Sequence, residues 1–141
     1  MADLLDGLAR HLQAKSLVSY KPTSADGDCF LENMPPSPDV AIVLTIYDDG
    51  RESDSLLGYD EPRVQVRVRG TQDPRVSRQM CQAIRSELHG LGPVTLPDGT
   101  ELILSVALQN AAASLGADEL GRHEHVANFR MEHRAVTEHR V

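Results

Sequence analysis

The clearest pattern in this chain is a strict alternation of apolar and polar residues between positions 63 and 69. Successive side chains of a β-strand point to opposite faces, so Val64, Val66 and Val68 share one face. The opposite face carries Arg63, Gln65, Arg67 and Arg69. The alternation therefore predicts a strand with its valines in the core and a row of arginines on the other side.

Two segments have helical periodicity. Leucines at positions 4, 5, 8 and 12 predict a first amphipathic helix that ends near Ser16. A second helix is predicted after position 70, because Thr71 and Asp73 are suitable N-caps and Pro74 suits a first turn. It is expected to end near positions 89–90, and its apolar residues recur at intervals of four: Val76, Met80, Ile84 and Leu88.

Three further segments have the apolar composition of strands. They are residues 41–47, residues 102–108 and residues 126–131, the last reaching toward Val136. The run at 41–47 is nearly continuously apolar and is expected to lie centrally, buried on both faces. Residues 17–20 are predicted as a further short strand.

The remaining segments are predicted as connections. Residues 22–39 contain four prolines and form a long irregular loop. Residues 48–62 begin with Asp48-Asp49-Gly50 and are expected to form a loose hairpin anchored by Leu56, Leu57 and Tyr59. Residues 93–99 form a turn, and residues 109–121 are a link rich in Ala and Gly. Loops as long as the first two are usually functional in a small domain.

The order of these elements predicts the fold class. Helix, strands, helix and strands follow one another without a repeat or a linker between two halves. This order is typical of an α+β fold, with two helices packed on a mainly antiparallel sheet and long loops between them. We expect one domain that spans residues 1–141.

Composition narrows the classes of function. The 141 residues carry a formal net charge of −7 with no long basic run, and only 4% are aromatic, so the usual signature of a nucleic-acid-binding surface is missing. The N-terminus does not resemble a secretory signal, and no apolar run is long enough for a membrane span. Cys29 and Cys81 lack the spacing of a redox motif or a zinc site and are expected to be reduced thiols.

Candidate chemistry is sparse. His123 and His125 share one face of a predicted strand, with Glu124 between them, and could in principle offer metal ligands. The interpretation that we favour is a polar strand face, with Arg130, His133 and Arg134 nearby. G-x-S-x-G and glycine-rich phosphate-binding motifs do not occur. We therefore expect no catalytic residue, no cofactor and no metal.

The arginine row allows two interpretations. Arg63, Arg67 and Arg69 could contact phosphates, because alternate residues present their guanidinium groups on one side of a strand. The same row could pair with carboxylates of a neighbouring subunit. The acidic balance, with 21 Asp and Glu against 14 Lys and Arg, favours the subunit interface.

Several short motifs, taken in order, carry a family resemblance. They are Asp28-Cys-Phe-Leu-Glu-Asn-Met-Pro-Pro-Ser-Pro-Asp39, Thr45-Ile-Tyr-Asp-Asp-Gly50, Val64-Gln-Val-Arg-Val-Arg69, Gln109, Leu115-Gly-Ala-Asp-Glu-Leu-Gly-Arg122 and Val126-Ala-Asn-Phe129. Together they resemble the minor capsid and tail-terminator family of long-tailed bacteriophages. The resemblance spans nearly the whole chain, and none of its motifs is chemical.

The resemblance implies a structural virion protein. Such a subunit closes a hexameric ring at the head-proximal end of the tail tube, stops tube polymerisation and presents a surface to the head connector. Its partners are further copies of itself, the tail tube protein, a head-completion or connector protein, and genomic DNA that passes through the lumen without specific binding. It is assembled in the host cytoplasm and does not contact a membrane.

The interface residues that we expect come from the arginine row, from the first long loop and from the family turn. They are Arg63, Arg67, Arg69, Phe30, Met34, Asp118, Glu119 and Arg122. The loops 22–39 and 48–62 are the candidates for contacts with neighbouring subunits and with the tube. Asp118 and Arg122 have a second interpretation, as a pair that stabilises its own turn between Gly116 and Gly121.

Alternatives remain at this point. The chain could be another small head–tail connector protein, a soluble protein-binding module, or a small metal-dependent hydrolase that uses His123, Glu124 and His125. Metal content of the purified protein and capture of a host partner would distinguish the last two.

Overall fold

The computed structural model describes residues 3–24, 26–48 and 52–141. It contains two helices, α1 (Leu4–Ala14) and α2 (Pro74–Leu88). Its strands are β1 (Cys29–Leu31), β2 (Ala41–Asp48), β3 (Tyr59–Asp60), β4 (Arg63–Arg69), β5 (Val94–Thr95), β6 (Glu101–Ala107), β7 (Ala113–Ala117) and β8 (His123–Arg134). The predicted α+β class, with two helices and a mainly antiparallel sheet, is confirmed.

Both helices begin at an aspartate cap. The Asp3 carboxylate accepts a hydrogen bond from the Leu5 backbone N–H, and the Asp73 carboxylate accepts one from the Arg75 N–H, so each satisfies a donor that a helix start leaves free. Helix α1 buries the predicted leucines. Helix α2 buries the predicted Ile84 and Leu88. In its first half Ser77 and Cys81 are buried, whereas the predicted Val76 and Met80 are half-buried.

The sheet is organised around β8. Its strand order is β1-β2-β4-β8-β6-β5, and β3 and β7 also pair with β8. Strand β8 is 12 residues long, so one side of it accommodates β4 and β3 and the other side β7 and β6. All pairs are antiparallel except β1 with β2. The predicted last strand is therefore longer than residues 126–131 and joins most of the sheet.

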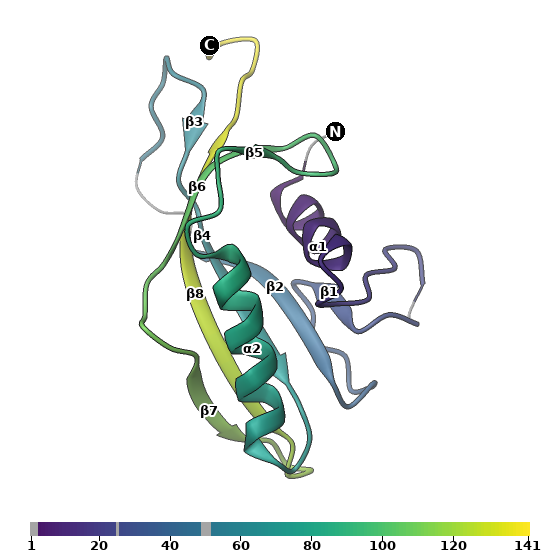
Figure 1. The fold of residues 1–141 in the computed structure, drawn as a ribbon. Coiled ribbons are helices and arrows are strands. Elements are labelled where there is room, and N and C mark those ends of the chain that lie inside the picture. Colours follow the sequence, from purple (N-terminus) through teal and green to yellow (C-terminus); the bar gives the residue numbers. More distant parts are fainter. Residues whose placement is uncertain (1–2, 25, 49–51) are drawn as a thin grey trace.

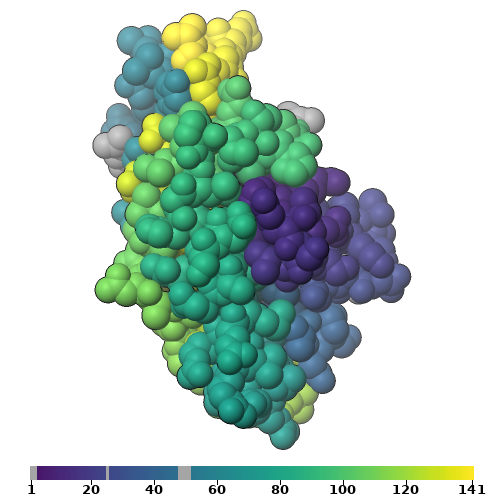
Figure 2. All heavy atoms as spheres, viewed as in Figure 1, coloured from purple at the N-terminus to yellow at the C-terminus, as the bar shows by residue number. Residues whose placement is uncertain are grey.

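Both helices cover the same face of the sheet (Figure 1). Val64, Val66 and Val68 point toward the helices and are fully buried, as the alternation predicted. Residues of β2 and β8 with the same orientation, such as Leu44 and Phe129, complete the core. Figure 2 shows α1 and α2 as adjoining bodies on this face, where a hydrogen bond of 3.0 Å joins His11 Nε2 to Glu87 Oε2.

Several connections differ from the prediction. Residues 17–20 form no strand and contribute one isolated bridge, between Tyr20 and Cys29. Both long connections contain short strands, β1 within 22–39 and β3 within 48–62, and β3 pairs with β8 instead of closing a hairpin. Strand β5 lies within the predicted turn 93–99, and β7 lies within the predicted link 109–121.

Two apolar segments are less buried than expected. Leu56 and Leu57 are 71% and 52% exposed, so they do not anchor the loop that contains them. The end of β2 is also open, because Ile46 and Tyr47 are 40% and 42% exposed beyond its buried first half. The predicted break at Asp48-Asp49-Gly50 falls partly outside the described residues, which omit 49–51. In the part of the chain that is described, no helix has the length and apolar character needed to cross a bilayer.

Candidate interaction surfaces

The face of the sheet that the helices leave uncovered is polar. We call it the outer sheet face and define it by the residues of β4 and β8 that point away from the core. They are Arg63, Gln65, Arg67, Arg69, Glu124, Val126, Asn128, Arg130 and Glu132. The predicted arginine row is therefore real as a strand pattern, and it lies beside carboxylates of β8.

Cross-strand pairs organise the middle of this face. The Arg67 guanidinium donates a hydrogen bond of 2.8 Å to Glu124 Oε1, and the Gln65 amide donates one of 3.2 Å to Asn128 Oδ1. The Arg67 side chain is still 41% exposed, whereas that of Glu124 is 11% exposed. Pairs of this kind stabilise adjacent strands. Arg67 thus keeps donors available to a neighbouring molecule while it neutralises a nearly buried carboxylate.

Arg69 departs from the expectation of an exposed row. Its residue is only 4% exposed, because the loop after Asn33 folds over it. Its guanidinium donates hydrogen bonds of 2.7 Å to the carbonyls of Pro35 and Pro38 and of 2.9 Å to that of Asp39. Burial and the neighbouring Arg122 lower the pKa of Arg69. Its position shows a side chain that holds a loop, not one that is open to a partner.

The family turn is stabilised from within. The Asp118 carboxylate accepts hydrogen bonds from the backbone N–H of Leu120 and Arg122 and from the Arg122 side chain, at 2.8 to 3.0 Å. Arg122 also donates to the Pro36 carbonyl and to Asp39. The interpretation of Asp118 and Arg122 as a turn-stabilising pair is confirmed. Glu119 is exposed at the tip of the turn.

Arg69 and Arg122 together fix the segment between Pro35 and Asp39. The two side chains reach it from β4 and from the turn before β8, and together they bind four of its backbone carbonyls at 2.7 to 2.9 Å. Both Phe30 and Met34 precede this segment and are half-buried. The first long loop is thus an ordered part of the surface, and its shape depends on two arginines far away in the sequence.

A second ordered projection stands at the opposite end of the molecule. We call it the tip and define it as residues 52–60 with 135–141, whose backbones are joined by hydrogen bonds between Gly58 and Val141, Val141 and Leu56, and Ala135 and Gly58. Arg140 locks the two segments together, because it donates to Asp60 and to the carbonyls of Leu57 and Tyr59. Figure 1 shows β3 and the C-terminal segment side by side at this end.

The tip exposes apolar side chains next to acidic ones. Leu56, Leu57, Val136 and Val141 are between 52% and 77% exposed. A groove of about 660 Å³ lies beside them. Five carboxyl groups line it, those of Glu52, Asp54, Asp60, Glu61 and Glu132. Two of them are paired with arginines, Asp60 with Arg140 and Glu61 with Arg130.

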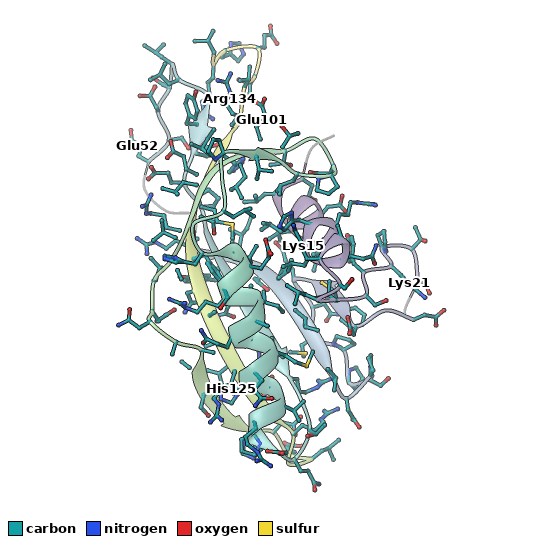
Figure 3. The ribbon with its side chains drawn as sticks, in the orientation of Figure 1. Lys15, Lys21, Glu52, Glu101, His125 and Arg134 are labelled. Carbon is teal, nitrogen blue, oxygen red and sulfur yellow. The ribbon has the colours of Figure 1, made fainter. Side chains whose placement is uncertain are left out.

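The candidate metal cluster is not assembled. Glu124 lies on the outer sheet face, bound to Arg67, while His125 points into the core, where its Nδ1 is 2.7 Å from Ser77 Oγ (Figure 3). Burial, with Arg78 and His123 nearby, lowers the pKa of His125. Within residues 3–24, 26–48 and 52–141, no three His, Cys, Asp or Glu side chains are grouped as metal ligands would be. The structure therefore does not bring these three residues together as a metal site.

The two cysteines are not poised for reaction. Cys29 and Cys81 are free and buried. Burial raises the pKa of both thiols to about 12, with Asp28 adding to the effect at Cys29. The reactive thiolate is therefore scarce at neutral pH.

A family comparison decides between the remaining classes. A family model described as bacteriophage tail terminator protein matches residues 11–133, which include the sheet, α2, the long loops and the family turn. The chain belongs to the bacteriophage tail terminator family. No curated protein and no solved structure matches it. Membership confirms the predicted family and makes this terminator a structural component of a phage tail.

Sequence reasoning missed two features of these surfaces. The tip depends on the pairing of Gly58 with Val141, and the fixed loop depends on Arg69 and Arg122. The arginines that alternate with valines in β4 were the available signal for a side chain that holds a loop. The alternation does not show which arginine has that role, since Arg67 and Arg69 both follow it.

Proposed function

We propose that this terminator forms a hexameric ring at the head-proximal end of the tail tube, where it ends tube polymerisation and provides the surface that joins the tail to the head. The observation that carries the proposal is the family match over residues 11–133. The chain joins the tail in the host cytoplasm. Its partners are further copies of itself, the tail tube protein and a head-completion or connector protein.

The described surfaces support a ring. A closed ring of identical subunits needs two different complementary surfaces on each copy. The outer sheet face carries guanidinium groups that remain partly exposed, those of Arg67 and Arg130 among them. The family turn carries the exposed Glu119. We infer that Arg63 and Arg67 of one copy lie close to acidic residues such as Glu119 of the next, because arginine and carboxylate pair well at interfaces.

The remaining predicted interface residues act through loop shape in this account. Arg69, Asp118 and Arg122 are engaged within the subunit, so they shape the segment that follows Met34 instead of contacting a partner themselves. Phe30 is positioned separately, by the pairing of β1 with β2. The tip, with Leu57 exposed at 52%, is our candidate for the contact with the tube protein or the connector. Apolar exposure of this kind often marks an interface.

DNA passes through the proposed lumen without specific binding. The net charge of −7 per copy disfavours adhesion of a polyanion to the wall of the ring. Substituting carboxylates that line the lumen by amides is expected to slow DNA ejection. Ejection at an unchanged rate in such variants would contradict this part of the proposal.

Deletion of the gene in a phage that encodes it tests the proposal. Without the protein, electron micrographs are expected to show overlong tubes of variable length and heads without tails. Expression of the protein in trans restores a single tail length, and gold-labelled antibody marks one end of each tail. Leu57→Glu is expected to restore fewer joined particles than the matched variant Leu108→Glu, whose leucine is also exposed, at 40%, but lies away from the tip. Normal tails in the deletion strain would overturn the proposal.

A further inference from the structure

The groove beside the tip has apolar side chains that a partner can reach. They come from β2, from the tip and from the residue before β4, and they are Ile46, Leu57, Tyr59 and Pro62. Ile46 and Leu57 are 40% and 52% exposed. Leucines and valines on the rest of the tip are exposed as well. Apolar surface gathered around a groove is typical of a protein interaction site.

The groove also keeps an excess of negative charge. Two of its five carboxyl groups, those of Asp60 and Glu61, are paired with arginines of the same subunit. In the part of the chain that the structure describes, Glu52, Asp54 and Glu132 form no such ion pair. Figure 3 shows Glu52 at this end of the molecule. The charge of these three groups is therefore left for a partner to neutralise.

The tip holds its apolar side chains in place before any partner binds. The Asp54 carboxylate accepts hydrogen bonds of 2.8 Å from the backbone N–H groups of Leu56 and Leu57. The same hydrogen bonds lower the pKa of Asp54, so this group stays ionised. Arg140 ties the segment to the C-terminal residues through the Leu57 carbonyl and the Asp60 carboxylate. A surface that is already ordered loses less conformational entropy when a partner docks.

Charge complementarity indicates the kind of partner. The carboxylates repel DNA and acidic protein surfaces, and the tips of two copies repel each other. A lysine or arginine next to apolar residues suits both parts of the groove, because its stem packs on apolar surface while its charged end meets a carboxylate. The family is described as tail terminators, so the end of the tail tube is the partner that the proposed function requires first.

We propose that the groove beside the tip binds a segment of the tail tube protein in which a lysine or arginine lies between apolar side chains. The basic group pairs with the carboxylate of Glu52 or Glu132, and the apolar side chains pack on Ile46 and Leu57. The inference rests on the proposed function, and it adds the chemistry of the segment that the tube protein presents.

Two substitutions at one position test the sign of the partner's charge. Leu57→Glu and Leu57→Lys both remove the exposed leucine, but only the lysine adds repulsion against a basic partner. Each labelled variant is shown to be folded by circular dichroism and mixed with purified tail tubes, and the bound fraction is measured by co-sedimentation. We expect Leu57→Lys to bind about threefold or more weakly than Leu57→Glu at low salt. Equal binding, or weaker binding of Leu57→Glu, overturns the inference.

Neutral variants of the groove test its carboxylates separately. Glu52→Gln and Glu132→Gln each remove one charge and keep the size of the side chain. The matched control is Glu87→Gln, because Glu87 lies on α2 and contacts His11. We expect both groove variants to bind tubes about threefold or more weakly than the control, with a smaller difference at about 500 mM NaCl, where charges are screened. Binding equal to that of the control overturns the inference.

Other occupants of the groove give different results. If the groove variants bind tubes normally but no longer join tailless heads, the connector occupies the groove, and the inference is overturned. Normal tube binding with a loss of self-association in light scattering indicates a second copy and overturns it too. Wild-type protein that does not bind tubes, or binds them without stopping their growth, contradicts the proposed function itself.

Discussion

Replacing Arg69 by methionine tests how the first long loop is held. The substitution keeps an unbranched apolar stem and removes three hydrogen bonds from a buried guanidinium to the carbonyls of Pro35, Pro38 and Asp39. A hydrogen bond to a charged group contributes about 1.5–3 kcal/mol. The expected loss is smaller than the sum of three such contributions, because the carbonyls belong to a surface loop and can bind water once the guanidinium is removed. We expect the free energy of unfolding to fall by about 2–4 kcal/mol.

Urea denaturation followed by circular dichroism measures this loss. Arg130→Met is the matched control, because Arg130 lies on the same sheet face with its side chain 35% exposed and forms a loose ion pair of 3.8 Å with Glu61. Arg130→Met is expected to lower the free energy of unfolding by less than about 1 kcal/mol. Arg69→Lys should fall between the two, since an ammonium group cannot bind three carbonyls in a guanidinium's fork. Equal losses for Arg69→Met and Arg130→Met, with no faster proteolysis of residues 32–40, would refute the reasoning.

Three further predictions concern stability. Ser105→Ala is expected to leave the unfolding free energy unchanged or raise it by up to about 1 kcal/mol, because the buried Ser105 hydroxyl has no hydrogen-bond partner among the described residues; a clear loss in urea denaturation would contradict this. Gly92→Ala should cost at least about 2 kcal/mol more than Gly90→Ala, since both glycines have positive φ but an added Cβ at Gly92 alone would overlap a carbonyl of β6; equal thermal shifts would refute it. Burial lowers the pKa of His125 and His133 below the ordinary 6.5, so these side chains bind protons more tightly in the unfolded chain than in the folded one. The midpoint of urea denaturation should therefore be constant above about pH 6.5 and decrease as the pH falls from about 6.5 to 5. A midpoint that rises over this range would contradict the prediction.

The parts of the fold that the sequence predicted are those with a strong local period. The valines of β4 alternate because one face of that strand is buried, and α1 and α2 carry both a stripe and an aspartate cap. Strand β7 has no such signal, since it is exposed on both faces and is built from Ala, Ser, Leu and Gly. Its strand conformation comes from pairing with β8, which is a long-range contact.

The surroundings of the candidate interface residues could not be predicted from the sequence. The sequence placed Arg67 and Arg69 in one row, and the structure separates them, because the segment from Pro35 to Asp39 folds over Arg69 alone. The sequence predicts a loose hairpin for residues 48–62, whereas in the structure this segment is joined at Gly58 to Val141, far away in the chain. Local patterns do not encode which distant segment covers a strand end.

The most direct test of the central claim is the extension of purified tail tubes. Tubes are incubated with this terminator, fresh tube protein is added, and lengths and end densities are measured by electron microscopy. The account predicts a ring of extra density at one end of each tube and no further growth from that end. Tubes that keep growing at the same rate, or protein bound along their sides, would contradict it.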